Sequence, residues 1–311
     1  MAMAAMTADW RDTFTRWSKP ASDNEEAMAE RAANMIRTAV RGHAAFAGRN
    51  IDVYGTGSYR NNTNVRSESD IDVAVVCRDS VFYELPPSLA PATVGFNGPA
   101  PYGFEAFRAD LEAALRAKFG SATVAADKTF NVPENTYRLE ADVTPFFEFQ
   151  RYTGGRDANL RWVFDEGVKS VSRRGETFIN WHDDHYRQGV ARNDQTRLRF
   201  KRVARILKNV KCDMAERGSE DARAAVAKVP SFLVECLVFN APDTCFNLDA
   251  NAYVADVKAV ISHLWNATKP DGTWRALSEV SRRKTLFLDG QAWTREMANT
   301  FLLRAWQHLG F

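Results

Sequence analysis

Cysteine is scarce in this sequence and never occurs in a metal-binding pair. The 311 residues include four cysteines, and none of them stands in a Cys-x-x-Cys pattern: Cys77, Cys212, Cys236 and Cys245. This spacing argues against a zinc ribbon. Scattered thiols are typical of proteins from a reducing compartment rather than of secreted, disulfide-bonded domains. The sequence therefore predicts a cytoplasmic protein, and its length allows a full core without disulfide or metal cross-links.

The sequence also lacks an excess of either charge and any long hydrophobic run. Its 41 Lys and Arg nearly balance 39 Asp and Glu, for a formal net charge of +2. This balance argues against binding of nucleic acid by bulk positive charge, so no stable nucleic-acid partner is expected. The N-terminal residues have neither the basic start nor the apolar centre of a signal peptide. The most apolar window, residues 232–239, contains Glu235 and is far shorter than the ~20 residues of a membrane span.

The pattern of apolar residues predicts an α+β protein, with a mixed α/β core in residues 1–190. Ser22 and Glu25 form the sequence signature of a capping box ahead of an N-terminal helix. The other elements expected in this part are strands at 51–54, 71–76 and 137–149, the last broken near Pro145, and a helix at 104–119. Residues 86–101 are rich in proline and are expected to form a loop.

Residues 191–311 are expected to form a separate helical domain. Apolar residues recur at helical spacing in four segments, 196–211, 231–240, 250–265 and 294–309, and clear strand candidates disappear. This division predicts a protein of two lobes. An active site in a cleft between the lobes would be the usual arrangement.

The stretch between Gly55 and Val76 carries the strongest chemical signal. Gly57 and Ser58 follow a predicted strand, and a glycine there lets a phosphate approach the backbone closely. Ser58 adds a hydroxyl and, if it opens a helix, a free N–H group. Asp70 and Asp72 follow after eleven intervening residues, and because side chains alternate along a strand, both carboxylates share one face. Their repulsion is tolerable when a divalent cation sits between them, so the pattern predicts a magnesium–nucleotide site.

Two-metal chemistry needs a third carboxylate, and Asp142 is the best candidate. It lies in a segment expected to form a strand beside the one that carries Asp72. Glu140 shares its face by alternation and is the rival. Asp142 is favoured because Pro145 closes the strand soon after it. Of two Mg²⁺ ions, or Mn²⁺ in their place, one would activate an attacking hydroxyl and the other would neutralise a triphosphate.

These motifs together resemble a known superfamily. Gly57-Ser58, Asp70-x-Asp72 and the distant Asp142 resemble the DNA polymerase β-like nucleotidyltransferases. The longer string YGTGSYRNNTNVRSESDIDVAV, residues 54–75, is similar to the bacterial cGAS/DncV-like nucleotidyltransferases (CD-NTases). A second block supports this, because TRLRFKRVARILKNVK and the later VPSFLVECL resemble that family's R-x-L-K and I-P-S-F-x-x-E-x-L helices. The resemblance covers roughly residues 25–245.

The resemblance implies a catalytic core at 1–190 and an oligoadenylate-synthetase-like helical domain at 191–311. It implies an enzyme that joins nucleoside triphosphates into a cyclic di- or trinucleotide and releases pyrophosphate. Such enzymes act in anti-phage (CBASS) signalling, where the cyclic product activates a separate effector protein. By the same resemblance, the chain is expected to be a monomer.

The resemblance also assigns roles to individual residues. Asp70, Asp72 and Asp142 would hold magnesium, with Asp142 helping to activate the acceptor hydroxyl. Ser58 would bind the donor triphosphate next to Gly57. Two positions in the helical half, Lys208 and Ser231, match residues that contact the triphosphate or ribose. Asn180 is a candidate for selecting the base, since an amide can both donate and accept hydrogen bonds.

The helix expected at 196–211 has two contrasting faces. At 3.6 residues per turn its apolar residues share one face: Phe200, Val203, Ile206, Leu207 and Val210. Lys201, Arg205 and Lys208 fall on the opposite face. Such a cationic stripe suits a triphosphate, and it is equally typical of a helix face in contact with solvent.

Two other functions remain open from the residues alone. One is a linear nucleotidyltransferase acting on RNA or a small molecule, although an RNA-extending enzyme would usually show a stronger basic surface. The other is a catalytically silent nucleotide-binding module, against which the three carboxylates argue because such a cluster costs stability without a metal. His182 and His185, with two aspartates between them, are a weak candidate for zinc, since no further ligand cluster is visible.

Overall fold

The structure is a computed structural model and describes residues 2–65, 70–249 and 252–311. The chain forms two compact units. The sheet unit consists of Ser22–Tyr59 and Ser69–His182. The helical unit consists of Met1–Ala21, Arg60–Glu68 and Asp183–Phe311.

This division differs from the predicted boundary at residue 190. Residues 1–21 belong to the helical unit, because Phe14 has no exposed surface and packs in the core of that unit. Residues 60–68 also belong to the helical unit, although the sequence places them between Ser58 and Asp70. Apolar spacing indicates that a residue is buried and not which core buries it, so neither assignment could be predicted from the apolar pattern.

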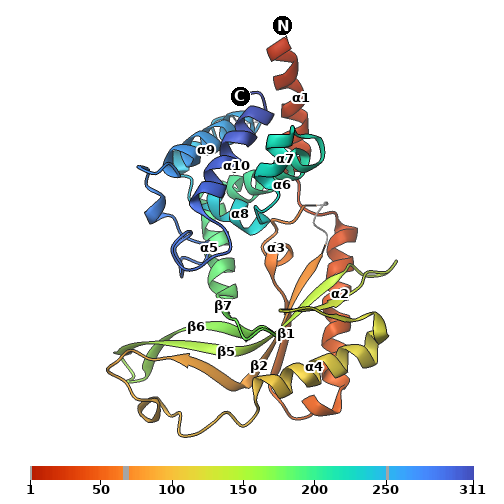
Figure 1. Cartoon of the computed structure of the whole chain (residues 1–311), viewed down its shortest axis with the longest axis vertical. Helices are drawn as coiled ribbons and strands as arrows, with labels where there is room; N and C mark the ends of the chain where they lie inside the picture. The colour runs from red at the N-terminus through yellow and green to blue at the C-terminus, as the bar shows by residue number, and fades with distance from the viewer. Residues whose placement is uncertain (1, 66–69, 250–251) are drawn as a thin grey trace. The chain divides into compact units, whose positions relative to one another are not determined.

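A mixed sheet, of seven strands in the described part of the chain, forms the centre of the sheet unit (Figure 1). The strands are β1 (Ile51–Gly55), β2 (Ile71–Glu84), β3 (Val124–Ala125), β4 (Phe130–Val132), β5 (Ala141–Arg156), β6 (Trp162–Val171) and β7 (Thr177–Asn180). β2 pairs with β1 in antiparallel and with β5 in parallel orientation. The other edge of β5 pairs antiparallel with β4 and then with β6. The parallel pair β2–β5 is therefore covered by a neighbouring strand on each side.

Two helices, α2 (Asp23–Gly42) and α4 (Phe104–Phe119), cover one face of this sheet (Figure 1). α2 begins at the predicted capping box, since the Ser22 hydroxyl accepts from the Glu25 N–H and the Glu25 carboxylate accepts from the Ser22 N–H. Ile71, Val73 and Val75 alternate along β2 and are buried under these helices. The shorter elements of the unit are α3 (Gly57–Arg60), η1 (Ala44–Phe46), η2 (Pro91–Val94) and η3 (Gly120–Ala122).

The expected break of the last strand near Pro145 is wrong. β5 runs without interruption through Pro145, which lies opposite Val75 of β2. On its other edge, β4 pairs only as far as Val143, and β6 begins to pair at Phe147. Proline is tolerated in a strand where the missing N–H has no ladder partner to supply, and Pro145 lies in the gap between these two pairings.

The helical unit contains the helices that the sequence predicts in its second half. Its elements are α1 (Ala2–Trp17), α5 (His182–Gln195), α6 (Arg199–Arg217), α7 (Glu220–Val226), α8 (Ser231–Phe239), η4 (Asp243–Cys245), α9 (Val254–Ala267), η5 (Trp274–Ala276) and α10 (Arg295–His308). The predicted apolar face of α6 is confirmed, since Phe200, Val203 and Ile206 have no exposed surface. Residues 250–251 of the helix expected at 250–265 lie outside the described residues. None of the described helices combines the length and the apolar character needed to cross a membrane.

The substitution Phe14→Ala tests the assignment of α1 to the helical unit. Removing the buried ring leaves a cavity, so the free energy of unfolding should fall by about 3–5 kcal/mol. Thermal unfolding followed by circular dichroism measures the change. Thr15→Ala is the control, because Thr15 is exposed on the same helix. Equal melting temperatures for the two variants would contradict the assignment.

Candidate active site

The turn after β1 lies directly against β2. The N–H of Thr56 donates to the Asp72 carbonyl at 2.8 Å, which holds the turn on the strand. Gly57 follows with a φ of +63°, and a Cβ at this position would lie 1.9 Å from Asp72 Oδ2. A side chain is excluded both by the left-handed backbone and by this close approach. Ser58 lies in the single helical turn α3, as the sequence predicts.

The register of the parallel pair places two of the predicted carboxylates opposite each other. Asp72 of β2 is the partner of Asp142 of β5, and the Ile71 N–H donates to the Glu140 carbonyl at 2.9 Å just before them. The neighbours Ile71 and Val73 point into the core under α2 and α4. Asp72 and Asp142 therefore point to the other face of the sheet. The predicted pairing of these two strands is confirmed.

Asp70 and Glu140 each stand two residues before one of these aspartates, so the alternation of side chains adds them to the same acidic group. Asp70 directly precedes β2 and is exposed, as Asp72 is, whereas Asp142 is half-buried. Glu140, the rival candidate, accepts a hydrogen bond from the Asn131 side chain. The Thr129 hydroxyl donates to Asp142 Oδ1 at 3.4 Å. Burial raises the pKa of Asp142 above its usual value, and the negative charge of Glu140 raises it further. The hydrogen bonds that Asp142 accepts lower its pKa, but by less.

The carboxylates suit a metal ion whose coordination a substrate completes. In residues 2–65, 70–249 and 252–311, no group of three or more His, Cys, Asp or Glu side chains lies in positions that would hold a metal ion. Mg²⁺ does not require such a cage, because it usually binds one or two carboxylates together with substrate phosphates and water. Asp72 and Asp142 would supply two such oxygen ligands from neighbouring strands.

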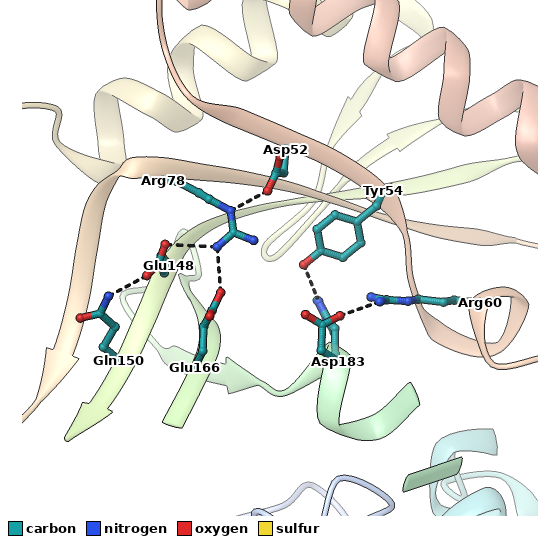
Figure 2. A network of polar contacts seen from close by, with 9 residues as sticks. Asp52, Tyr54, Arg60, Arg78, Glu148, Gln150, Glu166 and Asp183 are labelled. Atoms are coloured by element: carbon teal, nitrogen blue, oxygen red, sulfur yellow. Dashed lines mark hydrogen bonds and ion pairs between the residues drawn. The ribbon is translucent and has the colours of Figure 1, made fainter. Parts of the chain in front are cut away.

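Asn180 shares the sheet face that carries these carboxylates. Along β5, Asp142 and Glu148 are an even number of residues apart, so their side chains share one face. Glu148 is paired with Val168 of β6, and Val168 with Asn180 of β7, and paired residues lie on the same face of a sheet. Aromatic side chains lie on the same face between these positions. Phe146 packs with Phe178, and the Tyr54 hydroxyl lies 3.2 Å from Nδ1 of His182 (Figure 2). The face thus combines an acidic end with an aromatic and amide-bearing middle.

A second polar network, around Arg78, was not singled out by the sequence. Its guanidinium contacts Asp52, Glu148 and Glu166 at 2.5, 3.1 and 2.9 Å, from β1, β5 and β6 (Figure 2). Burial by itself would lower the pKa of Arg78, but these hydrogen bonds raise it above its usual range. The Arg78 guanidinium thus links β2 to three other strands. These residues are too far apart in sequence for a local pattern to reveal the network.

In the helical unit, Lys208 is buried and fully hydrogen-bonded. Its ammonium donates to the Thr63 carbonyl at 3.0 Å, to Thr63 Oγ1 at 3.1 Å and to Glu235 Oε2 at 2.7 Å. These contacts use all three hydrogens of the ammonium. The family resemblance places Lys208 at the triphosphate or ribose, and in the structure its ammonium contacts a carboxylate of the same unit.

The basic face of α6 is not a solvated face. Arg205 is buried, and its guanidinium donates to the carbonyls of Ser18 and Asn62. Burial lowers the pKa of Arg205 to about 10 and also lowers that of Lys201. The expectation of an open cationic stripe is therefore wrong for Arg205 and Lys208, because chain segments far away in sequence cover them.

Lys211, which the sequence did not single out, contacts the predicted site residue Ser231. Its Nζ lies 2.5 Å from Ser231 Oγ at the start of α8. Lys211 is partly exposed and follows Lys208 by three residues, so both lie on one side of α6. That spacing was a signal that sequence reasoning did not use.

The two histidines considered for zinc have separate partners. His182 contacts Tyr54 in the sheet unit. His185 Nε2 lies 3.0 Å from Glu235 Oε1 in the helical unit. Of the aspartates between them, Asp183 binds Arg60 (Figure 2) and Asp184 binds Arg187 and Arg283. These four side chains form no zinc site.

Comparison with known proteins connects this arrangement to one family. Residues 187–310 match the cGAS/DncV-like nucleotidyltransferase C-terminal helical domain. The chain is 36% identical over 307 residues to the cyclic dipyrimidine nucleotide synthase CdnE of Legionella pneumophila, with 98% of this chain and 99% of that protein covered. It is 34% identical to the cyclic dipyrimidine nucleotide synthase CdnE of Cecembia lonarensis, with 96% and 98% covered.

A solved structure shows the same likeness in three dimensions. The CdnE cyclic dinucleotide synthase of Elizabethkingia meningoseptica, solved with GTP and Apcpp, matches with a TM-score of 0.77 and 30% identity, over 97% of this chain and 99% of that chain. The likeness thus extends over the sheet unit and the helical unit alike. The chain belongs to the cGAS/DncV-like nucleotidyltransferases (CD-NTases) and is a nucleotidyltransferase.

Proposed function

We propose that this protein joins nucleoside triphosphates into a cyclic di- or trinucleotide and releases pyrophosphate. The observation that carries the proposal is the register that sets Asp72 opposite Asp142, beside the turn at Gly57. Two curated relatives of nearly full length are cyclic dipyrimidine nucleotide synthases, so pyrimidine nucleotides are expected among the substrates. The cyclic product would act on a separate effector in anti-phage (CBASS) signalling.

Asp70, Asp72 and Asp142 are the proposed ligands of two Mg²⁺ ions, which Mn²⁺ would be able to replace. When bound, such ions supply Lewis-acid activation of a hydroxyl and neutralise the charge of a triphosphate. Gly57 and Ser58 would bind the donor triphosphate, since the backbone at Gly57 permits close approach. Asn180 would contribute to the choice of base through its amide. In the helical unit, Ser231 would contact the triphosphate together with Lys211.

For a cyclic dinucleotide, the proposed reaction is the same transfer carried out twice; a trinucleotide needs one more transfer before the ring closes. A ribose hydroxyl oxygen of the acceptor forms a bond to the donor α-phosphorus, and the bond between that phosphorus and pyrophosphate breaks. The hydroxyl proton passes to a carboxylate oxygen of Asp142, which is half-buried and lies opposite Asp72 in the pairing of β5 with β2. A second transfer, with the linear product supplying both the hydroxyl and the triphosphate, closes the ring.

The double variant Asp70→Ala/Asp72→Ala tests the carboxylates. We expect product formation to fall by at least about 10³-fold, because the metal ligands are lost, while the melting temperature stays the same or rises as repulsion is removed. Radiolabelled nucleoside triphosphates with Mg²⁺ or Mn²⁺, followed by phosphatase and mass analysis, measure the product. Asp79→Asn is the control, because Asp79 lies on β2 and accepts from the Asn50 N–H.

The product itself distinguishes the proposal from its alternatives. A phosphatase-resistant product of discrete mass, made by the wild type and absent in the double variant, is the expected result. A phosphatase-sensitive ladder would indicate a linear transferase instead. Chelation of the divalent metal should abolish the product, and activity that persists in EDTA would contradict the proposed metal site.

The substitution Gly57→Ala tests the turn. The new methyl group would meet Asp72 Oδ2 and would also strain a backbone with positive φ, so the carboxylate or the turn must move. We expect kcat to fall by about 100-fold, the effect of roughly 1 Å of misplacement. Gly48→Ala is the matched control, because Gly48 has a φ of +75° and open space around its Cβ position. Equal activity of the two variants would contradict the requirement for glycine beside Asp72.

A further inference from the structure

Residues 60–65, which follow the turn at Gly57 and Ser58, are held by the helical unit. They belong to that unit, although Tyr59 before them and β2 after them belong to the sheet unit. Thr63 has no exposed surface, and Asn61, Asn64 and Val65 are also buried. A polar stretch of this kind would ordinarily lie in solvent as a loop. Its burial therefore calls for specific partners.

Those partners form a compact group around Thr63. The Thr63 hydroxyl donates to Glu235 Oε2 at 2.5 Å and accepts from Lys208 Nζ at 3.1 Å, and the Thr63 carbonyl accepts from the same ammonium at 3.0 Å. Lys208 and Glu235 are themselves paired at 2.7 Å and are almost completely buried. We call Thr63, Lys208 and Glu235 the Thr63 clamp. It fixes both the backbone and the side chain of Thr63.

Two neighbouring contacts support the clamp. His185 Nε2 lies 3.0 Å from the second carboxylate oxygen of Glu235. Arg205 donates to the carbonyl of Asn62, which has a positive φ of 53°. Burial alone would raise the pKa of Glu235, but Lys208 and His185 lower it well below its usual range. The carboxylate is therefore held in its charged form.

Stability alone does not account for these charges. A buried ion pair loses hydration that its mutual attraction repays only in good geometry, and a well-packed apolar pair of similar volume often serves a core as well. An apolar pair would not form the hydrogen bonds that orient the Thr63 hydroxyl and carbonyl. The use of charge at this place thus indicates a requirement for position.

We propose that Lys208 and Glu235 are positioning residues for nucleotidyl transfer, which act by fixing Thr63 and through it residues 60–65, the segment that follows the turn at Gly57 and Ser58. Thr63 stands five residues after Ser58 and seven before Asp70. A displaced Thr63 shifts the course of the chain that leaves the proposed donor-binding turn. The inference rests on the proposed function and adds to it a role for residues that touch neither nucleotide nor metal.

The test compares Thr63→Val with Thr268→Val. Thr268 is the matched control because it lies in the same unit, has no exposed surface, and its hydroxyl also both donates and accepts. It donates to the Leu264 carbonyl at 2.8 Å, with a longer contact to the Trp265 carbonyl at 3.2 Å, and accepts from Asn299. Both variants lose a buried hydroxyl and should lose similar stability. We expect kcat for product formation to fall by about 10- to 100-fold in Thr63→Val only. Thr63→Ser keeps the hydroxyl, so its kcat should be within about twofold of the wild-type value. A difference this small would mean that residue 63 has not moved.

The outcomes separate the clamp from the proposed function. A wild type that forms no cyclic product would contradict the proposed function itself. An active wild type with equal kcat in Thr63→Val and Thr268→Val would overturn the clamp. If Thr63→Val fails to fold, Lys208→Met/Glu235→Met replaces the ion pair by an apolar pair of similar size. A lowered kcat with unchanged KM in that variant supports the clamp, whereas unchanged kcat, or a raised KM alone, overturns it.

Discussion

The parallel pairing of β2 with β5 is the constraint on which the site depends. It sets Asp72 opposite Asp142 only because Ile71 and Val73 are buried on the other face together with Ala141 and Val143. A shift of one residue would move these apolar side chains out of the core and the carboxylates into it. Burial of the apolar face therefore holds the like charges together. The catalytic geometry is secured by packing that takes no part in the chemistry.

The two units treat charge in opposite ways. In the sheet unit, Asp70, Asp72 and Asp142 gather negative charge at one end of a sheet face, where burial and Glu140 raise the pKa of Asp142. In the helical unit, Lys208 and Glu235 neutralise each other in the core. The first arrangement favours a cation, and a phosphate only through that cation. The second fixes a segment of chain, and its charges are not available to a ligand.

Neighbouring strands restrict which residue types are accepted at two backbone positions, Gly57 and Pro145. Gly57 has no alternative, because any Cβ would meet the carboxylate of Asp72. Pro145 is accepted in β5 because one edge of the strand has no paired residue at that point. In both cases the requirement comes from a neighbouring strand. The residue type alone would suggest an ordinary turn and a strand end.

The sequence by itself determined the local elements and the chemistry of the motif. Strand alternation placed Asp70 and Asp72 on one face, helical spacing located α6 and α8, and the capping box located α2. Only the tertiary structure decided that α1 and residues 60–65 belong to the helical unit, and that Lys208 faces Glu235. The physical reason is that periodicity reports which side of an element is buried. The partner that buries it is brought from far along the chain, as Thr63 is brought to Lys208 across 145 residues.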